Sequence, residues 1–344
     1  MRKCVGLLMV CLLTLGTTAN AASTWVSGNV GNWSDATNWA GGVPTGTATG
    51  QINNGTCTLD TSQSLGIVLM GGAATDVGVL NINSGANLNI YKSGSSEAFC
   101  LGKFAGTTNE TVNHSVGTVR VGAVGTANGG TYETRLVTGS TVTTATSTYN
   151  LSGSAVLDTD ILSKGNKADT GAAFNATGGM LVVRTMIYKF GLNSEGYGFN
   201  QGQAKLEIGA INTVAAITVG NSTNSMDYTV GTGGTLDFDI ASATSFDTIT
   251  QYGNIANTAG ATLQVDLLGG YTPTVGSTFD VWTFNDKTKA GSGAFGVLPA
   301  GWTANWVDTS ADGSLDTLRL TYTPEPATIT LLGLGLLAIR RNKK

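Results

Sequence analysis

The stretch LNINSGANLNI, residues 80–90, places a short alternating apolar segment on each side of a glycine. The same frame recurs in residues 228–238 (YTVGTGGTLDF) and 255–265 (IANTAGATLQV). Alternation with a period of two predicts β-strands, and the central glycine predicts a corner with positive φ between them. Aligned, the three frames read Leu80, Gly85, Leu88, Ile90; Tyr228, Gly233, Leu236, Phe238; and Ile255, Gly260, Leu263, Val265.

Looser copies of the frame begin at Tyr149 (YNLSGSAVLDTDI) and Phe174 (FNATGGMLVV), and a degenerate copy is expected around residues 206–219. The starts at 149, 174, 228 and 255 differ by 25, 54 and 27 residues, which indicates a unit of about 26. Such a unit buries a core only by stacking on its neighbours. The sequence therefore predicts an all-β fold, a right-handed parallel β-helix. A jelly roll would alternate without one repeated interval.

The composition agrees with an all-β protein. Charged residues make up 12% of the chain, which contains 49 glycines and only 5 prolines. Short polar side chains and glycine disfavour helices. Without residues 1–21 and 327–344, 12 basic and 22 acidic residues remain, a formal charge of −10. Nucleic acid is bound through clustered Lys and Arg, so this balance argues against it.

The N-terminus has the pattern of a secretory signal peptide, residues 1–21. Arg2 and Lys3 precede an apolar run, and the run leads to an Ala-x-Ala cleavage pattern that ends at Ala21. Export leads to an oxidising compartment, where Cys57 and Cys100 either form a disulfide or remain two unpaired thiols. Sequence does not decide between these alternatives, because nothing in it fixes their separation.

The chain closes with TPEPATITLLGLGLLAIRRNKK, residues 323–344. Residues 327–339 carry no charge. As a helix they would extend about 20 Å at ~1.5 Å per residue, against a hydrocarbon thickness of about 30 Å. Cations are retained on the cytoplasmic side, so the body would lie outside the inner membrane. The cations are Arg340, Arg341, Lys343 and Lys344.

The segment Pro324-Glu325-Pro326, the apolar run and the basic cluster together resemble the PEP-CTERM sorting signal of Gram-negative bacteria that make extracellular polysaccharide. The resemblance implies recognition of the tripeptide by an exosortase, a membrane-embedded cysteine protease-transpeptidase. It further implies removal of the tail and release or attachment at the cell surface. The two prolines hold the tripeptide extended, as a protease cleft requires.

Segments rich in aromatic residues flank the repeats. Trp25, Trp33 and Trp39 resemble the N-terminal start of many secreted bacterial β-helix and autotransporter-like proteins. Residues 275–286, 293–308 and 315–323 resemble the closing segment that precedes PEP-CTERM tails. Exposed ends of a stack need caps. The expected division is a signal peptide (1–21), an N-terminal cap (22–60), β-helix repeats (61–268), a C-terminal β cap (269–323) and a sorting signal with a hydrophobic transmembrane helix (324–344).

Stacking the repeats predicts a ladder of carboxylates. Asp160, Asp239 and Asp266 share one position of the unit, with Asp158 and Asp237 two residues earlier. Neighbouring strands lie about 4.8 Å apart, so these charges repel unless they are solvated or bridged by a cation. One interpretation is a calcium-binding or polysaccharide-lyase groove. The favoured interpretation is an outward, solvated face, because no basic partner recurs beside these residues in the sequence.

Other candidate residues carry little chemistry. His114 has no evident acid partner and is expected to be a strand residue. The segment DTSADGSLD spaces Asp308, Asp312 and Asp316 wrongly for an EF-hand and predicts a hairpin turn at Asp312-Gly313. The tryptophans Trp33 and Trp39 are expected to pack in the cap, with a sugar platform as the alternative. No phosphate loop, nucleophile elbow or metal motif occurs in the sequence, so no catalytic residue, metal or cofactor is predicted.

These patterns predict a non-enzymatic surface or matrix protein, exported, held briefly at the inner membrane, processed by an exosortase and associated with extracellular polysaccharide. Two other functions stay open. A β-helix polysaccharide lyase or hydrolase would use the acidic ladder, by analogy of fold alone. An adhesin or carbohydrate-binding protein would use the tryptophans.

Overall fold

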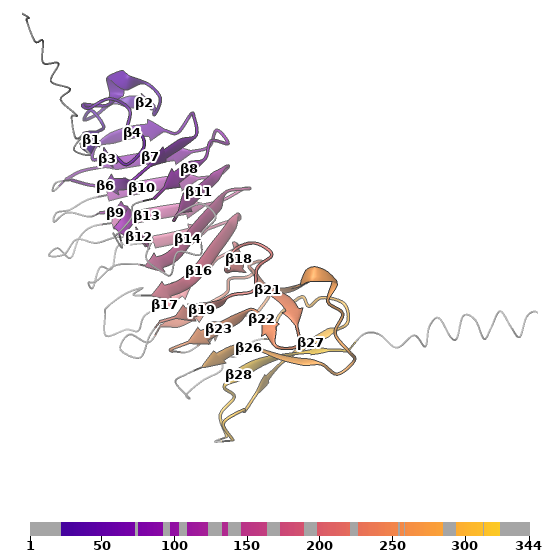
Figure 1. The fold of residues 1–344 in the computed structure, drawn as a ribbon. Helices are drawn as coiled ribbons and strands as arrows, with labels where there is room; N and C mark the ends of the chain where they lie inside the picture. The colour runs from indigo at the N-terminus through magenta and orange to yellow at the C-terminus, as the bar shows by residue number, and fades with distance from the viewer. Residues whose placement is uncertain are drawn as a thin grey trace, which may run out of the picture.

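The computed structural model describes residues 22–72, 75–91, 97–102, 109–122, 133–136, 146–163, 173–188, 198–220, 226–253, 255–257, 259–284, 294–311 and 313–323. The fold is all-β and built from parallel sheets, as the sequence predicts. The strands lie side by side across an elongated body that runs from β1 and β2 at one end to β28 at the other (Figure 1). Two short 3-10 helices, η1 (Ala36–Asn38) and η2 (Leu268–Gly270), are the helices found in these ranges.

A large sheet of 19 strands forms most of the body. Its strands are β1 (Ala22–Thr24), β3 (Thr49–Ile52), β5 (Gln63–Leu65), β6 (Ile67–Met70), β8 (Leu88–Ile90), β9 (Glu97–Leu101), β11 (Thr118–Val121), β12 (Glu133–Leu136), β14 (Val156–Ser163), β16 (Met180–Tyr188), β18 (Lys205–Ile208), β19 (Ala216–Val219), β21 (Thr235–Ser242), β22 (Ser245–Phe246), β23 (Thr248–Gln251), β25 (Thr262–Leu267), β26 (Thr278–Phe284), β27 (Trp302–Val307) and β28 (Thr317–Tyr322). The pairings are parallel except those of β22, β27 and β28.

Two smaller parallel sheets complete the body. The six-stranded sheet contains β2 (Val30–Asn32), β4 (Gly55–Thr58), β7 (Gly78–Ile82), β10 (Asn109–His114), β13 (Thr146–Leu151) and β15 (Ala173–Ala176), paired in chain order. The three-stranded sheet contains β17 (Gly198–Asn200), β20 (Asp227–Thr229) and β24 (Ile255–Asn257).

The register of the strands confirms the alignment of the repeats. Tyr149 lies opposite Phe174, and Tyr228 lies opposite Ile255. The second halves of the frames are also aligned, with Leu236 opposite Leu263. The interval between partners is less regular than predicted, since the asparagines at one position of the six-stranded sheet are 32, 37 and 25 residues apart. Much of the added length falls within residues 123–132 and 137–145, outside the described ranges.

The predicted position of the degenerate copy was wrong. Phe199 in β17 pairs with Tyr228, and Leu206 in β18 pairs with Leu236. The copy therefore begins at Phe199, and Leu206 belongs to its second half. Phe199 and Leu206, the apolar residues that mark its two strands, are one residue closer in sequence than Tyr228 and Leu236. The glycine-centred frame is displaced as a result.

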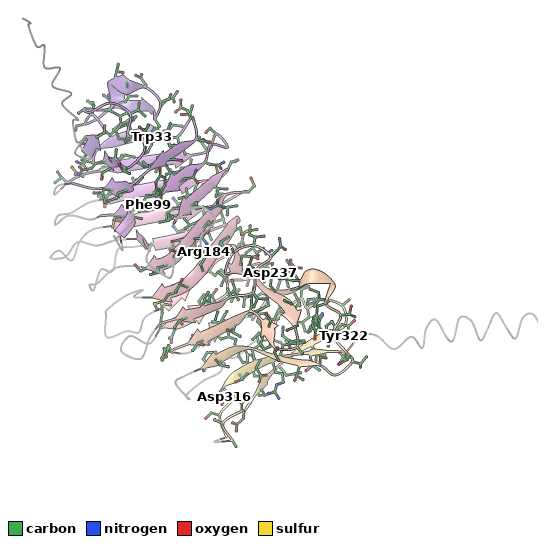
Figure 2. All side chains as sticks on the ribbon, viewed as in Figure 1. Trp33, Phe99, Arg184, Asp237, Asp316 and Tyr322 are labelled. Atoms are coloured by element: carbon green, nitrogen blue, oxygen red, sulfur yellow. The ribbon has the colours of Figure 1, made fainter. Side chains whose placement is uncertain are left out.

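Alternate residues of the strands point into one continuous core. In β7, Leu80 and Ile82 are buried while Val79 and Asn81 are partly exposed, which is the period-two pattern. Phe99 and Tyr149 meet edge to face inside the body with ring centroids 6.2 Å apart. Figure 2 shows side chains along the whole length, with Trp33 near the N-terminal end and Tyr322 near the other.

The described chain ends in antiparallel strands. β26 pairs with β28, and β28 with β27, at the end of the large sheet. A hairpin is thus confirmed between β27 and β28, although a longer loop joins them than the predicted two-residue turn. The Asp308 carboxylate accepts the backbone N–H groups of Ala311 (2.7 Å) and Gly313 (2.8 Å), and Asp316 accepts those of Thr309 (2.9 Å) and Ser310 (3.0 Å). Asp312 lies outside the described residues.

Both predicted targeting segments fall outside the described residues. They are the signal peptide, residues 1–21, and the sorting signal with its hydrophobic helix and basic tail, residues 324–344. Within the ranges that the structure describes, no helix is long and apolar enough to cross a membrane.

Candidate functional site

The predicted carboxylates lie on the outer face of the large sheet, where charged side chains occupy successive strands. Asp158 in β14 lies opposite Arg120 in β11, and farther along the body Glu207 in β18 lies opposite Asp237 in β21. Two residues after Asp237, Asp239 is in register with Asp266 of β25. The predicted alignment of Asp239 with Asp266 is therefore confirmed. Asp160 lies in β14, separated from β21 by β16 and β18.

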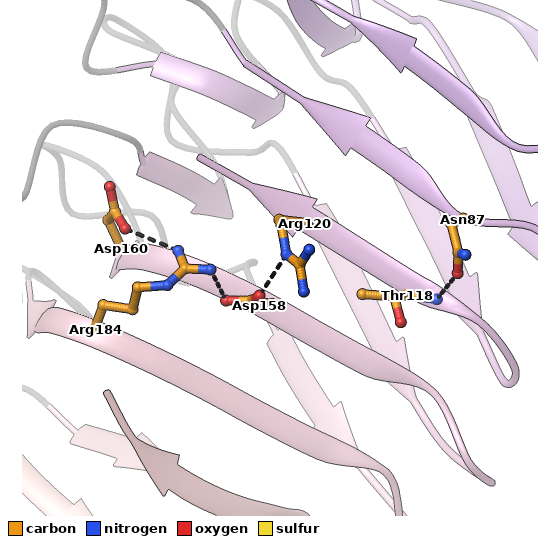
Figure 3. Close-up of polar contacts among 6 residues, drawn as sticks. All are labelled: Asn87, Thr118, Arg120, Asp158, Asp160 and Arg184. Carbon is orange, nitrogen blue, oxygen red and sulfur yellow. Dashed lines mark hydrogen bonds and ion pairs between the residues drawn. The ribbon is translucent and has the colours of Figure 1, made fainter. Parts of the chain in front are cut away.

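Two arginines and two aspartates form the first group on this face, the arginine cluster (Figure 3). Arg120 Nε donates to Asp158 Oδ2 at 2.7 Å. Arg184 spans both carboxylates: its Nη1 lies 2.8 Å from Asp160 Oδ1, and its Nη2 pairs with Asp158 Oδ1. Positive and negative charges are equal in this cluster. A guanidinium suits the arrangement because it presents several donors in a fixed plane.

The expectation of a solvated acidic face was wrong for these residues. Only 1% of Asp160 and 6% of Asp158 is exposed, and Asp239 is exposed by 1%. Their basic partners do not recur at one position of the unit, so the repeat pattern does not reveal them. Arg120 and Arg184 come from different strands and different columns of the sheet. Parallel pairing brings Arg120 next to Asp158 although 38 residues separate them.

One lysine and five carboxyl groups form the second group, the lysine cluster. Lys205 Nζ lies 3.3 Å from Glu207 Oε2 and pairs with Asp237 Oδ2. Asp247, just before β23, accepts the backbone N–H groups of Ala215 (2.6 Å) and Asp239 (2.8 Å). Carboxylates outnumber the cation, and burial makes this imbalance costly. The cluster comprises Lys205, Glu207, Asp237, Asp239, Asp247 and Asp266.

Burial raises the pKa of the central carboxyl groups of the lysine cluster. The pKa of Asp237 rises to about 7, although the Lys205 ammonium opposes the shift. Burial and the charges of Asp237 and Asp266 raise the pKa of Asp239 to about 6. Burial raises the pKa of Asp247 to about 8 against two backbone N–H donors. The cluster therefore takes up protons close to neutral pH.

Lowering the pH from 8 to 6.5 is expected to raise the free energy of unfolding by about 2 kcal/mol. Unfolded aspartates titrate near pH 3.8, whereas Asp237 and Asp247 titrate near neutrality in the folded protein. The folded state thus binds protons in this window that the unfolded state does not, so stability rises as the pH falls. Below pH 6.5 the rise continues, because Asp239 also takes up a proton in the folded state near pH 6. His114 opposes only part of it: burial lowers its pKa to about 4 in the folded protein, so in this range the unfolded state binds one proton that the folded state does not. Denaturant titrations at constant ionic strength measure the profile.

Two variants separate the lysine cluster from the rest of the protein. Asp239→Asn is expected to raise stability at pH 8 by about 1 kcal/mol, after allowance for solvent screening. It should also flatten the profile, because the charge of Asp239 contributes to the raised pKa of Asp247. Asp35→Asn is the control, since hydrogen bonds from Thr37 lower the pKa of Asp35 and it titrates below the window. If the free energy of unfolding of the wild type stays constant or decreases as the pH is lowered from 8 to 6.5, the carboxyl groups of the lysine cluster do not take up protons in this range.

The chemistry available on this face is limited. No group of three or more His, Cys, Asp or Glu side chains that could hold a metal ion occurs among the described residues. The pKa of Lys205 is raised: its ion pairs with Asp237 and Glu207 outweigh the effect of burial, so the ammonium keeps its proton. A lyase base must be able to lose its proton near the working pH. Lys205 is therefore held as a structural cation.

The tryptophans are packed as cap residues and do not form a sugar platform. Trp33 is fully buried and Trp39 is exposed by 4%. Their ring centroids lie 4.8 Å apart, and Trp39 Nε1 donates to the Trp33 carbonyl at 2.8 Å. Trp25 packs edge to face on Trp39 at 5.0 Å. The alternative of a carbohydrate-stacking surface on Trp33 and Trp39 was wrong, because no ring face is open to solvent.

The remaining predicted residues are structural. Cys57 and Cys100 are buried and no disulfide joins them, so that alternative was wrong. Cys57 lies in β4 of the six-stranded sheet and Cys100 in β9 of the large sheet. His114 is a buried strand residue, as predicted, with Nδ1 2.9 Å from the Tyr149 hydroxyl and Nε2 3.0 Å from the Gly117 carbonyl.

Comparison with known proteins identifies the end of the chain. Residues 323–344 match the PEP-CTERM protein-sorting motif. The chain carries a sorting signal. This PEP-CTERM motif supports an exported protein that is processed by an exosortase and sorted to the cell surface. No curated protein matches the chain.

Proposed function

We propose that this protein is a non-enzymatic component of the cell surface or extracellular matrix that associates with extracellular polysaccharide. The PEP-CTERM motif carries the proposal, because it directs the body outside the cell. The buried charges support a structural role. Carboxylates of the arginine cluster are engaged by guanidinium groups, and Lys205 is engaged by Glu207 and Asp237. A polysaccharide lyase or hydrolase would need such groups free to act on substrate.

The body would be a right-handed parallel β-helix of the kind seen in secreted and autotransporter-like proteins. Parallel pairing of successive copies of one frame supports it. The N-terminal cap, residues 22–60, would contain the packed tryptophans, and residues 61–268 would stack as repeats. Residues 269–323 would close the stack with antiparallel strands. Such a body is a rigid spacer that presents long, regular faces.

The proposed route begins with the signal peptide and a transient stop at the inner membrane. The apolar tail would hold the body outside, with Arg340 and Arg341 on the cytoplasmic side. Exosortase would then recognise Pro324, Glu325 and Pro326 and remove the tail. The protein would finally be released or attached at the surface.

Substitution within the tripeptide is expected to abolish processing. Glu325→Ala and Pro326→Ala, expressed in cells that contain the exosortase, should retain the tail and accumulate in the membrane fraction. Asn342→Ala, a substitution in the same tail outside the tripeptide, is the control and should be processed normally. Intact mass and cell fractionation give the readouts. Processing and location identical to wild type in both tripeptide variants would refute the sorting route.

A further inference from the structure

The six-stranded sheet has an outer face that differs chemically from the charged face of the large sheet. Two columns of side chains point outward along its strands. The residues between them, such as Leu80 and Tyr149, are buried, except for the partly buried Gly31 and Phe174. We name these two columns the amide face. The first contains Val30, Thr56, Val79, Thr111, Thr148 and Ala173, and the second Asn32, Thr58, Asn81, Asn113, Asn150 and Asn175.

Four asparagines of the amide face form a continuous chain of hydrogen bonds in a solvent-exposed position. Asn113 Nδ2 donates to Asn81 Oδ1 at 3.0 Å, Asn150 Nδ2 to Asn113 Oδ1 at 2.9 Å, and Asn175 Nδ2 to Asn150 Oδ1 at 3.1 Å. All donors point the same way along the body. The chain of bonds fixes the orientation of each amide group and holds it at the spacing of the strands, about 4.8 Å.

The fixed amides retain hydrogen-bonding capacity. A primary amide has two N–H donors and an oxygen with two lone pairs. The bonds along the ladder use one donor and one acceptor site of Asn113 and of Asn150. One donor and one acceptor site on each of these side chains are thus left over for another partner. A hydroxyl group, which both donates and accepts, satisfies either site.

Charge distinguishes this face from the rest of the body. Neither outward column contains an ionisable side chain, although the chain as a whole has a formal charge of −4. A neutral ligand meets no charge to desolvate here, whereas a polyanion is repelled by the acidic body. The amide face thus repeats a donor site beside an acceptor site and contains no charge. This arrangement suits a polymer whose units carry hydroxyl groups.

We propose that the amide face binds a neutral polysaccharide chain through Asn81, Asn113, Asn150 and Asn175. This inference rests on the proposed association with extracellular polysaccharide and names the surface responsible. A single hydrogen bond at an exposed site contributes little to affinity, because water competes for both of its groups. Affinity therefore depends on several strands engaging one polymer, whose repeated contacts raise the effective concentration of the next. The face lacks aromatic rings, so binding depends on the amides.

Cosedimentation with an insoluble neutral glucan, microcrystalline cellulose, tests the proposal. Wild-type protein should bind, and the double variant Asn113→Thr, Asn150→Thr should bind at least tenfold more weakly. Threonine keeps the position uncharged and suits a strand, so the loss would come from the amides. A second double variant, Asn113→Asp, Asn150→Asp, should also lose binding, because it replaces amide donors with negative charges. Thermal unfolding of each variant checks that the sheet is intact.

The control is Asn89→Thr, which changes an amide on the outer face of β8 in the large sheet and should leave binding unchanged. Asn89 Nδ2 lies 3.4 Å from Ser64 Oγ, a comparable exposed contact. If the folded double variants bind the glucan as well as wild type does, the amide face is not the binding surface. That result would leave the proposed association with polysaccharide standing. Wild-type binding to anionic alginate and not to the glucan would also overturn the inference that the amide face binds a neutral polysaccharide. Failure to bind these polymers and the polysaccharide of the producing cells would instead refute the proposed association.

Discussion

Replacement of Arg184 by alanine is expected to lower the free energy of unfolding by about 3–5 kcal/mol, since it removes one side of a buried ion pair. Arg184 contacts two carboxylates, and its side chain is only 16% exposed. Without it, Asp160 loses this ion pair and Asp158 retains Arg120. Two negative charges then lie close together in a desolvated position. Urea denaturation at pH 7 measures the change.

Arg319→Ala is the matched control for the arginine cluster. Arg319 pairs with Asp280 at 2.6 Å, but both side chains are more than one-third exposed. Exposed ion pairs contribute about 0.2–1 kcal/mol, so this variant should remain near wild type. If Arg184→Ala lowers the free energy of unfolding no more than Arg319→Ala does, the arginine cluster is open to water and is not buried.

The variant Gly117→Ala is expected to cost about 3 kcal/mol or to prevent folding. Gly117 has a φ of +88°, where a Cβ is strained. In addition, a Cβ at this position would lie 2.3 Å from the backbone carbonyl oxygen of Ala86. Neither backbone segment can withdraw easily, because Thr118 and Ala86 both lead into paired strands. The same denaturation experiment gives the free energy.

Gly233→Ala separates backbone strain from close packing. Gly233 has a similar φ of +85°, but the nearest atom to a Cβ would be Gln203 Cγ at 3.7 Å. Only the strain of about 1–2 kcal/mol applies there. A cost for Gly117→Ala no greater than that for Gly233→Ala would show that neighbouring copies are not packed as closely as the register requires.

Much of the fold can be predicted from the sequence, because the repeated frame indicates both where the backbone turns and which apolar residues pack in the core. Gly85, Gly233 and Gly260 were predicted to supply corners and have φ of +80°, +85° and +77°. The copy at Phe199 was misplaced because its two strands are one residue closer. Its register therefore depends on stacking against Tyr228 and Leu236, which local pattern does not reveal.

The charged face shows where sequence reasoning failed. The carboxylates Asp239 and Asp266 could be aligned because they belong to the repeated frame. The cations that pair with Asp160 and Asp237 could not be predicted, because Arg184 and Lys205 belong to no repeated position and reach these carboxylates from neighbouring strands. Asp247 belongs to no copy of the frame, yet it holds the backbone of Ala215 and Asp239. Partners of this kind depend on tertiary contacts alone.

The amide face was also missed, although its signal is present in the sequence. Asn81, Asn113 and Asn150 each follow a buried residue, and Asn175 follows the partly buried Phe174; in each case an outward-facing residue precedes that one. The unequal spacing of 32, 37 and 25 residues hides the series until the strands are paired. The targeting signal, by contrast, is read from contiguous residues and needs no tertiary structure.

The most direct test of the central claim is to mix the purified protein with the extracellular polysaccharide of the cells that produce it. Cosedimentation measures association, and new reducing ends or unsaturated sugars in the same mixture measure cleavage. A non-enzymatic matrix protein should bind the polysaccharide and leave its chain length unchanged over many hours. Release of shortened chains, lost in a variant of the lysine cluster such as Asp239→Asn, would contradict this account and favour a polysaccharide-degrading enzyme.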